Sequence, residues 1–352
     1  MNSVGLQYKD RNSSNSVFSK YRSLTTALLC TLVSTSTFAT EAEIKPIVLF
    51  QSEIHQGSYL YLVDKGTRRF EQTTSIPVTR KIIDKSNGLY IQELINAAKE
   101  GYSPIVVIES NSMDTFADVA RTYPSIRFIS LDVSYHVPNI LGLTFNHAEG
   151  AYIIGYLAGL KTKSNKVGFI GGKNIPTINN FKCGYELGLK DSNPTAVLNT
   201  DYINKGPRSW DDVDSAKAIS QKMLDENVDV IFPVAGYASL GVMEAVKNDG
   251  DSFSFGVDQD YSMQFPSSTL ASLEKKVDVA VFAALMQLKN GIWNGNRKHF
   301  GIKQGVINVA INSHNPSVST SDKTLIDKLI LELKGKNNAI SQKINLSCSS
   351  TQ

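Results

Sequence analysis

The segment that most constrains the fold is an almost wholly apolar stretch at residues 144–161. Asn146 can cap a helix, and Glu149 follows three positions later, which predicts a helix start of the capping-box type. Apolar residues then recur over most of the helical surface, a pattern typical of a helix buried inside a protein rather than lying on its surface. The sequence therefore predicts a domain large enough to enclose this helix.

Glycines in and after this helix predict close packing and a ligand-facing edge. Because three residues of the helix lack side chains, we expect it to approach a sheet closely at Gly150, Gly155 and Gly159. The β-branched segment at residues 167–170 then ends in two more glycines. The carboxyl edge of a parallel sheet is where α/β proteins bind ligands, so we expect these glycines to let backbone amides approach one.

Strands and helices alternate along most of the chain. Strands are expected at residues 47–50, 78–83, 105–108, 127–131, 167–170, 196–202, 228–233 and 253–257. Helices are expected at residues 58–70, 91–98, 115–123, 178–190, 211–226, 238–248, 276–288 and 324–333. Alternation of this kind predicts parallel sheets with helices on both faces.

A chain of 352 residues has room for two domains of ordinary size. We expect a first lobe of residues 44–144 plus 262–302, and a second lobe of residues 145–261 plus 303–333. The chain would then cross between the lobes three times, the second time between residues 260 and 266. The polar tail at residues 334–352 is expected to be loose.

The amino terminus reads as an export signal. Lys20 and Arg22 precede an apolar run at residues 24–33, and a small-x-small site follows at residues 37–39, which predicts a secretory signal peptide over residues 1–39. The run is too short to span a membrane. Loss of this segment removes four of 36 basic and one of 33 acidic residues, so the mature chain is balanced in charge and has no nucleic-acid footprint.

The three cysteines bear on anchoring and pairing. Cys30 lies within the apolar run, but the bulky Leu29 precedes it where a lipoprotein has a small residue, so a soluble periplasmic protein is favoured over one anchored at Cys30. Cys183 and Cys348 would remain after cleavage, and the sequence leaves open whether they pair.

Enzyme and metal motifs are missing from the sequence. The five histidines are scattered singly, without a zinc-binding spacing, and His55, His136 and His147 are interpreted as ordinary polar residues. Neither a Walker loop, a G-x-G-x-x-G segment nor a G-x-S-x-G elbow occurs. Asp211 and Asp212 are expected to complement a helix dipole. We therefore predict no metal, no cofactor and no catalytic residues.

Polar residues at strand ends suggest a binding site instead. Asp132, Gly236 and Asp258 each follow a buried strand, where a carboxylate can accept paired hydrogen bonds from vicinal hydroxyls. Lys275 could donate to the same group. Tyr59 and Trp210 come from opposite lobes and could sandwich a flat ring. Taken singly, each is more typical of a cap, a salt bridge or a core aromatic than of a binding residue.

Several motifs in order carry a resemblance to one family. These are Asn146-His-Ala-Glu-Gly, Gly155-Tyr-Leu-Ala-Gly, Lys166-Val-Gly-Phe-Ile-Gly-Gly and Phe181-Lys-Cys-Gly-Tyr-Glu. They resemble the basic membrane protein family of bacterial ABC-transporter substrate-binding proteins, whose characterised members include purine nucleoside receptors. The resemblance runs from about residue 47 to about residue 333. It implies a two-lobed type I periplasmic binding protein, with a doubly wound parallel sheet in each lobe.

The resemblance also assigns roles to single residues. It implies that Trp210 stacks on a base, that Asp132 faces the ligand, and that ribose-binding groups come from Gly236, Asp258 and Lys275. The loop at residues 50–61 departs from the family. It keeps the serine-aromatic pair Ser58-Tyr59, but Leu60 replaces an asparagine, and Gln51, Ser52 or Glu53 would have to replace an aspartate. Because that loop reads the ring edge in the relatives, the identity of the base stays open.

The expected function is capture of a small solute for an ABC importer with a separate ATPase subunit, and the resemblance favours a nucleoside as that solute. Membrane contact would occur only through the permease or a lipid anchor. One alternative is a receptor of the same fold for a sugar or another small signal. A second alternative is a secreted enzyme acting on nucleosides. A repressor of this fold is disfavoured because an export signal stands where a DNA-binding segment would lie.

Overall fold

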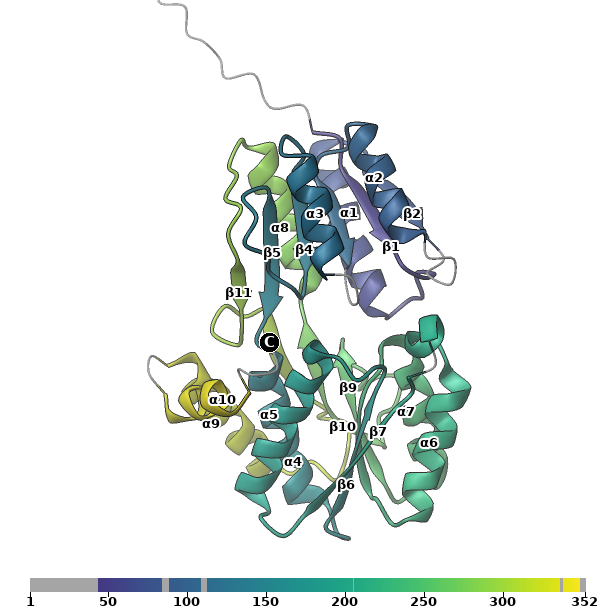
Figure 1. Cartoon of the computed structure of the whole chain (residues 1–352). Coiled ribbons are helices and arrows are strands. Elements are labelled where there is room, and N and C mark those ends of the chain that lie inside the picture. Colours follow the sequence, from purple (N-terminus) through teal and green to yellow (C-terminus); the bar gives the residue numbers. More distant parts are fainter. Residues whose placement is uncertain (1–43, 84–88, 109–112, 205, 336–337, 349–352) are drawn as a thin grey trace, which may run out of the picture. The chain divides into compact units, whose positions relative to one another are not determined.

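The computed structural model describes residues 44–83, 89–108, 113–204, 206–335 and 338–348 (Figure 1). The predicted signal peptide at residues 1–39, with Cys30, lies outside these residues. The described chain forms two sheets of six strands each, which we call the first and second sheets. Each sheet, together with the helices packed on it, is one lobe of an α/β fold.

The first sheet has the strand order β11-β5-β4-β3-β1-β2, and all its neighbouring strands are parallel. Its strands are β1 (Ile47–Phe50), β2 (Thr79–Ile82), β3 (Ile105–Ile108), β4 (Phe128–Leu131), β5 (Ile140–Phe145) and β11 (Lys298–Phe300). Its helices are α1 (Tyr59–Thr74), α2 (Tyr90–Lys99), α3 (Met113–Thr122) and α8 (Val277–Lys289). Leu49 of β1 packs in one core cluster with α2 and α3, whereas Val48 packs in another with α1 and α8. Helices therefore cover both faces of the sheet, which explains the continuous apolar sequences of β1 and β3.

The second sheet has the order β12-β10-β9-β8-β6-β7, and only β12 is antiparallel to its neighbour. Its strands are β6 (Lys166–Gly171), β7 (Val197–Tyr202), β8 (Val230–Val234), β9 (Phe253–Asp258), β10 (Thr269–Lys275) and β12 (Ile307–Ile311). Its helices are α4 (His147–Lys161), α5 (Pro176–Ser192), α6 (Val213–Asp225), α7 (Ser239–Asp249), α9 (Thr320–Lys334) and α10 (Ala339–Cys348). Two short 3₁₀ helices, η2 (Gly206–Trp210) and η3 (Gly236–Ala238), follow β7 and β8.

Helix α4 is buried along most of its length, as its apolar pattern predicts. The predicted capping box is wrong, because the Asn146 side chain makes no capping hydrogen bond. The Asn146 backbone N–H instead donates to the Phe300 carbonyl at 2.7 Å, and the Glu149 carboxylate accepts from the Ile302 N–H at 2.9 Å. The start of α4 is thus attached to the segment that leads from β11 to β12.

The close approach predicted for α4 involves mainly a helix, not a sheet. A Cβ atom added at Gly155 would lie 1.9 Å from the backbone oxygen of Tyr185 in α5. Conversely, one added at Gly188 of α5 would lie 1.9 Å from the backbone oxygen of Tyr152 in α4. Of the three glycines of α4, only Gly150 faces side chains of the second sheet. The glycines therefore let α4 and α5 pack backbone against backbone over one face of this sheet.

The second crossing between the lobes lies later than predicted. Residues 262–302 are expected in the first lobe, but β10 pairs with β9 and β12 and so belongs to the second sheet. Tyr261 and Phe265 pack on Met243 of α7, which keeps the connecting segment on the second lobe. The chain reaches the first lobe only after Lys275, at α8, which packs on α1. The strands predicted from the sequence also do not include β5, β10, β11 and β12.

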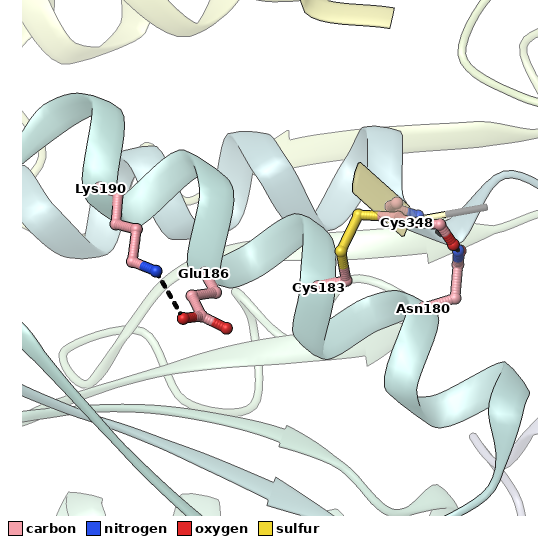
Figure 2. The surroundings of a disulfide bond; sticks show 6 residues. Asn180, Cys183, Glu186, Lys190 and Cys348 are labelled. Atoms are coloured by element: carbon pink, nitrogen blue, oxygen red, sulfur yellow. Dashed lines mark hydrogen bonds and ion pairs between the residues drawn. A yellow bond between two sulfur atoms is a disulfide. The ribbon is translucent and has the colours of Figure 1, made fainter. Parts of the chain in front are cut away.

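The prediction of a loose tail is wrong for residues 339–348, which form α10. This helix buries Ile340, Ile344 and Cys348, and it contacts α4, α5 and α9. Figure 2 shows Cys348 joined to Cys183 of α5 by a disulfide, with Asn180 beside the junction. The Asn180 amide donates to the Cys348 carbonyl at 3.4 Å. The pairing that the sequence leaves open is therefore present.

Candidate ligand-binding site

One cavity is lined by residues from both lobes. Those from the first lobe are Gln51, Ser52, Ser58, Tyr59, Leu60, Ile108 and Asp132. Those from the second lobe are Ile175, Thr177, Ile178, Phe181, Trp210, Asp211, Val234, Gly236, Tyr237, Val257, Asp258 and Lys275. Most of them end a strand or follow one, because parallel strands in each sheet bring their carboxyl ends to the same edge. The fold thus places the cavity where ligands bind in α/β proteins.

All six residues singled out from the sequence line this cavity: Tyr59, Asp132, Trp210, Gly236, Asp258 and Lys275. The structure brings them together from six separate parts of the chain. Their roles toward a ligand stay predictions. Trp293, the second tryptophan of the chain, is not among the residues that line the cavity, and its Nε1 donates to the Pro138 carbonyl of the first lobe at 3.1 Å.

Asp132 is held by protein groups from both lobes. The Tyr59 hydroxyl donates to its Oδ2 at 2.7 Å, and the Lys275 ammonium donates to its Oδ1. His147 Nε2 lies 3.4 Å from the same Oδ1. Burial alone would raise the pKa of Asp132, but Lys275 and His147 together hold it well below its usual range. Asp132 is therefore an anion whose main partners belong to the protein.

The same cluster orients Lys275 and keeps His147 neutral. Only 3% of Lys275 is exposed, and its ammonium lies 4.2 Å from the centre of the Tyr59 ring and 4.3 Å from that of Phe145. Burial and this neighbouring ammonium lower the pKa of His147 to about 4. The sequence gives no sign that His147 lies beside Asp132, because the two residues meet only through tertiary packing.

Asp258 occupies a position in the second lobe that matches Asp132 in the first. Asp132 follows and Asp258 ends the third strand in its sheet order, and both have left-handed backbone angles, with φ of 69° at Asp132 and 71° at Asp258. Within the described residues, the Asp258 carboxylate has no hydrogen bond and no ion pair. Burial raises its pKa to about 6, with Lys275 opposing this shift and Asp132 adding to it. Asp258 therefore offers free acceptor atoms to a ligand.

Glycines make room for Trp210 rather than for a ligand. A Cβ atom at Gly172 would lie 2.4 Å from the Trp210 ring. A Cβ atom at Gly171 would likewise collide with the Tyr202 ring. Neither glycine is among the residues that line the cavity. The prediction that these glycines expose amides to a ligand is thus wrong. Gly236, with φ of 60°, lies on the cavity wall and packs on the Trp210 backbone.

The loop after β1 presents two polar side chains to the cavity. Of the three residues considered from the sequence, Gln51 and Ser52 line it, whereas Glu53 does not. The Gln51 amide Nε2 donates to the Ile108 carbonyl at the end of β3. This contact fixes the amide at the edge of the first sheet.

Asp211 and Asp212 have different roles, which the sequence does not separate. Asp212 caps α6 by accepting from the Ser215 N–H at 3.0 Å, in line with the helix-dipole interpretation. Asp211 instead lines the cavity, where burial raises the pKa of its carboxylate and His55 and Ser52 lower it. His55 Nε2 lies 3.8 Å from Asp211 Oδ1, and the His55 ring stacks on Tyr237. The helix-dipole prediction is therefore incomplete for Asp211.

No group of three or more histidine, cysteine, aspartate or glutamate side chains within the described ranges is arranged to hold a metal ion. The chemistry offered by the cavity is instead recognition by hydrogen bonds and stacking. Its polar lining groups include Asp258, Lys275, Asp211 and Ser52, and the rest of its wall, which includes Trp210, is largely apolar.

Comparison with known proteins shows which family this chain matches. A family model described as ABC transporter substrate-binding protein PnrA-like matches residues 44–345. Basic membrane protein B of Borreliella afzelii (strain PKo) is 30% identical over 251 residues, which cover 69% of this chain and 72% of the relative. Basic membrane protein B of Borrelia garinii subsp. bavariensis is 26% identical over 302 residues, which cover 82% of this chain and 87% of the relative.

Solved structures support the fold. An ABC transporter solute-binding protein from Aeropyrum pernix K1 matches with a TM-score of 0.74 at 20% identity, covering 88% of this chain and 99% of the other. A carbohydrate transporter solute-binding protein from Agrobacterium radiobacter, in complex with D-arabinose, matches with a TM-score of 0.61 at 16% identity, covering 82% and 99%. Both confirm the two-lobed binding-protein fold.

None of the helices in the described part of the chain combines the length and the apolar character needed to cross a membrane.

Proposed function

Because the chain belongs to the family of PnrA-like ABC transporter substrate-binding proteins, we propose that it captures a nucleoside, with purines favoured, between its lobes. Such proteins bind small ligands and work with permease and ATPase subunits. The ligand would be bound on the extracytoplasmic side of the membrane and delivered to the permease, with the ATPase as a separate subunit. The protein itself would not transform the ligand.

The observation that carries this proposal is the pairing of an indole ring with a free carboxylate in one cavity. Trp210 offers a flat aromatic surface on which a base can stack. Asp258 has unpaired acceptor oxygens, which suit the two vicinal hydroxyls of a ribose, and Lys275 can donate to the hydroxyl oxygens. A nucleoside combines both chemical features, whereas a free base or a simple sugar has only one of them.

Tyr59 plays a more limited part than a simple ring sandwich would require. One face of its ring is covered by the Lys275 ammonium, and its hydroxyl is engaged by Asp132. It can therefore stack on a ligand only through its other face. We assign the main stacking surface to Trp210, while Tyr59 also holds Asp132 and Lys275 in place.

Contacts between the lobes support closure around the ligand. Besides the Lys275–Asp132 pair, the Tyr261 hydroxyl of the second lobe donates to the Gly57 carbonyl of the first at 3.2 Å. Gly57 has φ of 82°, a conformation that favours glycine. We propose that ligand binding stabilises this closed arrangement through contacts with both lobes, by rotation about the crossing segments.

Calorimetry with adenosine, guanosine, inosine, the free bases and pentose sugars tests the assignment. We expect nucleosides to bind more tightly than bases or sugars, and binding to change the tryptophan fluorescence. Trp210→Phe should remove most of this change while preserving binding, because a phenyl ring still stacks. Trp293→Phe is the matched control and should leave the change intact.

The same titrations distinguish the alternatives. If no nucleoside gives heat at millimolar concentration, the nucleoside proposal is wrong, and heat from a sugar alone would favour a sugar receptor. Chromatography of the bound nucleoside after long incubation should recover it unchanged. Release of free base would instead identify an enzyme.

Replacing Asp258 should weaken ligand binding but raise the stability of the ligand-free protein. We expect Asp258→Asn to weaken nucleoside binding at least about tenfold, since a charged hydrogen-bond acceptor is lost in a closed site. Wild-type affinity should fall as the pH is lowered through about 6, where Asp258 takes up a proton, and the variant should lack this dependence. Because the folded-state pKa is raised, the ionised group costs stability above that pH. The ligand-free variant should therefore be more stable than the wild type at pH 7.

Urea unfolding and calorimetry between pH 5 and pH 8 measure both effects. Asp251→Asn, which changes an exposed carboxylate of the same lobe, is the control and should alter neither nucleoside affinity nor the free energy of unfolding. Binding by Asp258→Asn that equals the wild type at pH 7 would remove Asp258 from the proposed site.

A further inference from the structure

The cavity contains a second carboxylate, Asp211, that is electrostatically separate from the first. The charged groups that influence Asp211 are His55, Arg208 and Glu53, whereas Lys275 and Asp132 influence Asp258. Asp211 directly follows Trp210, and both residues line the cavity. A base stacked on Trp210, with its ribose at Asp258, would point another part of its ring toward this second carboxylate.

The protein groups around Asp211 hold it as an acceptor without using all its capacity. Burial raises its pKa, while His55, the Ser52 hydrogen bond and Arg208 lower it. A carboxylate has about four lone-pair sites, and the known partners here are the Ser52 hydroxyl and, at 3.8 Å, His55 Nε2. Acceptor capacity therefore remains for a ligand in the cavity that Asp211 lines.

Gln51 adds a further acceptor to the same cavity. Its Nε2 donates to the Ile108 carbonyl, which leaves the amide oxygen Oε1 as the other polar atom of the side chain. Gln51 is the neighbour of Ser52, the residue that contacts Asp211 from the first lobe. Gln51 and Asp211 thus contribute acceptors to the cavity from the first and the second lobe.

From this arrangement we infer that Asp211 reads the ring edge of the bound nucleoside and selects bases that carry an N–H at ring position N1. The inference rests on the proposed nucleoside function. Guanosine and inosine carry an N–H at ring position N1, and guanosine adds an amino group next to it. Adenosine also has N–H donors, on its 6-amino group, but its N1 is unprotonated, and the N1 lone pair would face the acceptors. A site built to accept a hydrogen bond rejects a ligand that lacks the donor.

Binding of matched ligands to the wild-type protein gives the first test. We expect guanosine to bind at least about tenfold more tightly than adenosine, in keeping with the loss of a charged hydrogen bond. 1-Methylguanosine, which keeps the ring and the ribose but lacks the N1 hydrogen, should also bind at least about tenfold more weakly than guanosine. This comparison needs no variant, so it does not depend on how a mutant folds.

Asp211→Asn gives the second test, with Asp212→Asn as the matched control in the adjacent helix cap. The asparagine that this first variant introduces can donate through its amide, so guanosine should lose most of its advantage while adenosine binding changes by less than about threefold. Asp212→Asn should leave the ratio of the two affinities unchanged, because asparagine also caps helices.

The outcomes separate this inference from the function on which it rests. If no nucleoside binds the wild type, both fail. If nucleosides bind but adenosine, guanosine and 1-methylguanosine have equal affinities, the nucleoside function stands and the role of Asp211 is overturned. A preference for guanosine that survives Asp211→Asn would likewise overturn it.

Discussion

Replacing Lys275 with methionine is expected to lower the free energy of unfolding by about 3–5 kcal/mol and to abolish ligand binding. Lys275 is almost fully buried and donates to Asp132 across the two lobes. Methionine has a similar length but no charge, so the variant leaves a buried carboxylate without its main counterion. Removing one partner of a buried pair costs more than the pair itself contributes, because the remaining charge is unpaired.

The loss should depend on pH in a way that identifies its cause. In the wild type, burial and Lys275 lower the pKa of His147 to about 4. Without Lys275, Asp132 would favour the protonated ring, so the pKa of His147 in the folded variant should rise. A raised histidine pKa contributes stability at low pH that is lost as the pH rises through it. The destabilisation by Lys275→Met should therefore be smaller at pH 5 than at pH 8.

Urea unfolding at several pH values measures this effect, and two further variants control it. Lys276→Met changes the neighbouring exposed lysine and should have little effect. The double variant Lys275→Met with Asp132→Asn removes both charges and should regain much of the lost stability. A double variant as unstable as Lys275→Met alone would mean that packing, rather than the unpaired charge, explains the loss.

The sequence predicts the site better than it predicts the boundaries of the lobes. Asp132 and Asp258 are recognisable because each stands directly after a run of buried, mostly apolar residues, and parallel strands end at a common edge. Asp211 and His147 are not recognisable, because what distinguishes them is a contact with a residue far away in the sequence. Ser52 meets Asp211, and Asp132 meets His147, only after the chain has folded.

Strand β10 shows why the second crossing is misplaced. It contains Thr269 and Ser272, which are fully buried, so its sequence lacks the continuous apolar run of β1 or β3. The Ser272 hydroxyl accepts from the Tyr261 N–H at 3.1 Å, which satisfies a polar group that the pattern would place outside the core. Polar residues with such local partners hide a strand from analysis by hydrophobic pattern.

The sequence contains only a weak helical pattern in the segment that forms α10. Ile340, Ile344 and Cys348 recur every four residues, which places them on one helical face. The remaining residues of the segment are mostly polar, so its average composition resembles that of a loose tail. Three buried side chains are few for an independent helix, and a ten-residue helix is marginal by itself. The disulfide that attaches it to α5 explains why the segment forms a packed helix rather than a loose tail.

Removal of this disulfide is expected to cost about 2–4 kcal/mol in the free energy of unfolding. Cys183 and Cys348 are separated by 165 residues, so the bond closes a long loop and restricts the unfolded chain strongly. The double variant Cys183→Ser with Cys348→Ser tests this by urea unfolding beside the oxidised wild type. Reduction of the wild type should give the same loss, and a reductant should not affect the variant further.

The location of α10 predicts that this loss leaves ligand recognition intact. No residue of α10 lines the cavity, so nucleoside affinity should change by less than about threefold, measured by calorimetry well below the unfolding transition. Hydrogen exchange should become faster first in α10, because this helix loses its covalent bond to α5 and keeps only noncovalent contacts. They include the Ser341 hydroxyl that donates to Glu149 at 3.4 Å and the Lys343–Asp191 ion pair.

The contacts of Glu149 explain what would follow if the cysteine variant did not behave as predicted. Its carboxylate accepts from Ser341 of α10 and from the Ile302 N–H in the crossing between β11 and β12. If the cysteine variant stays as stable as the wild type, the entropy argument for the disulfide is wrong. If it loses stability and also binds nucleosides much more weakly, then α10 supports the crossing segment through Glu149, and Ser341→Ala should reproduce part of the weaker binding with the disulfide intact.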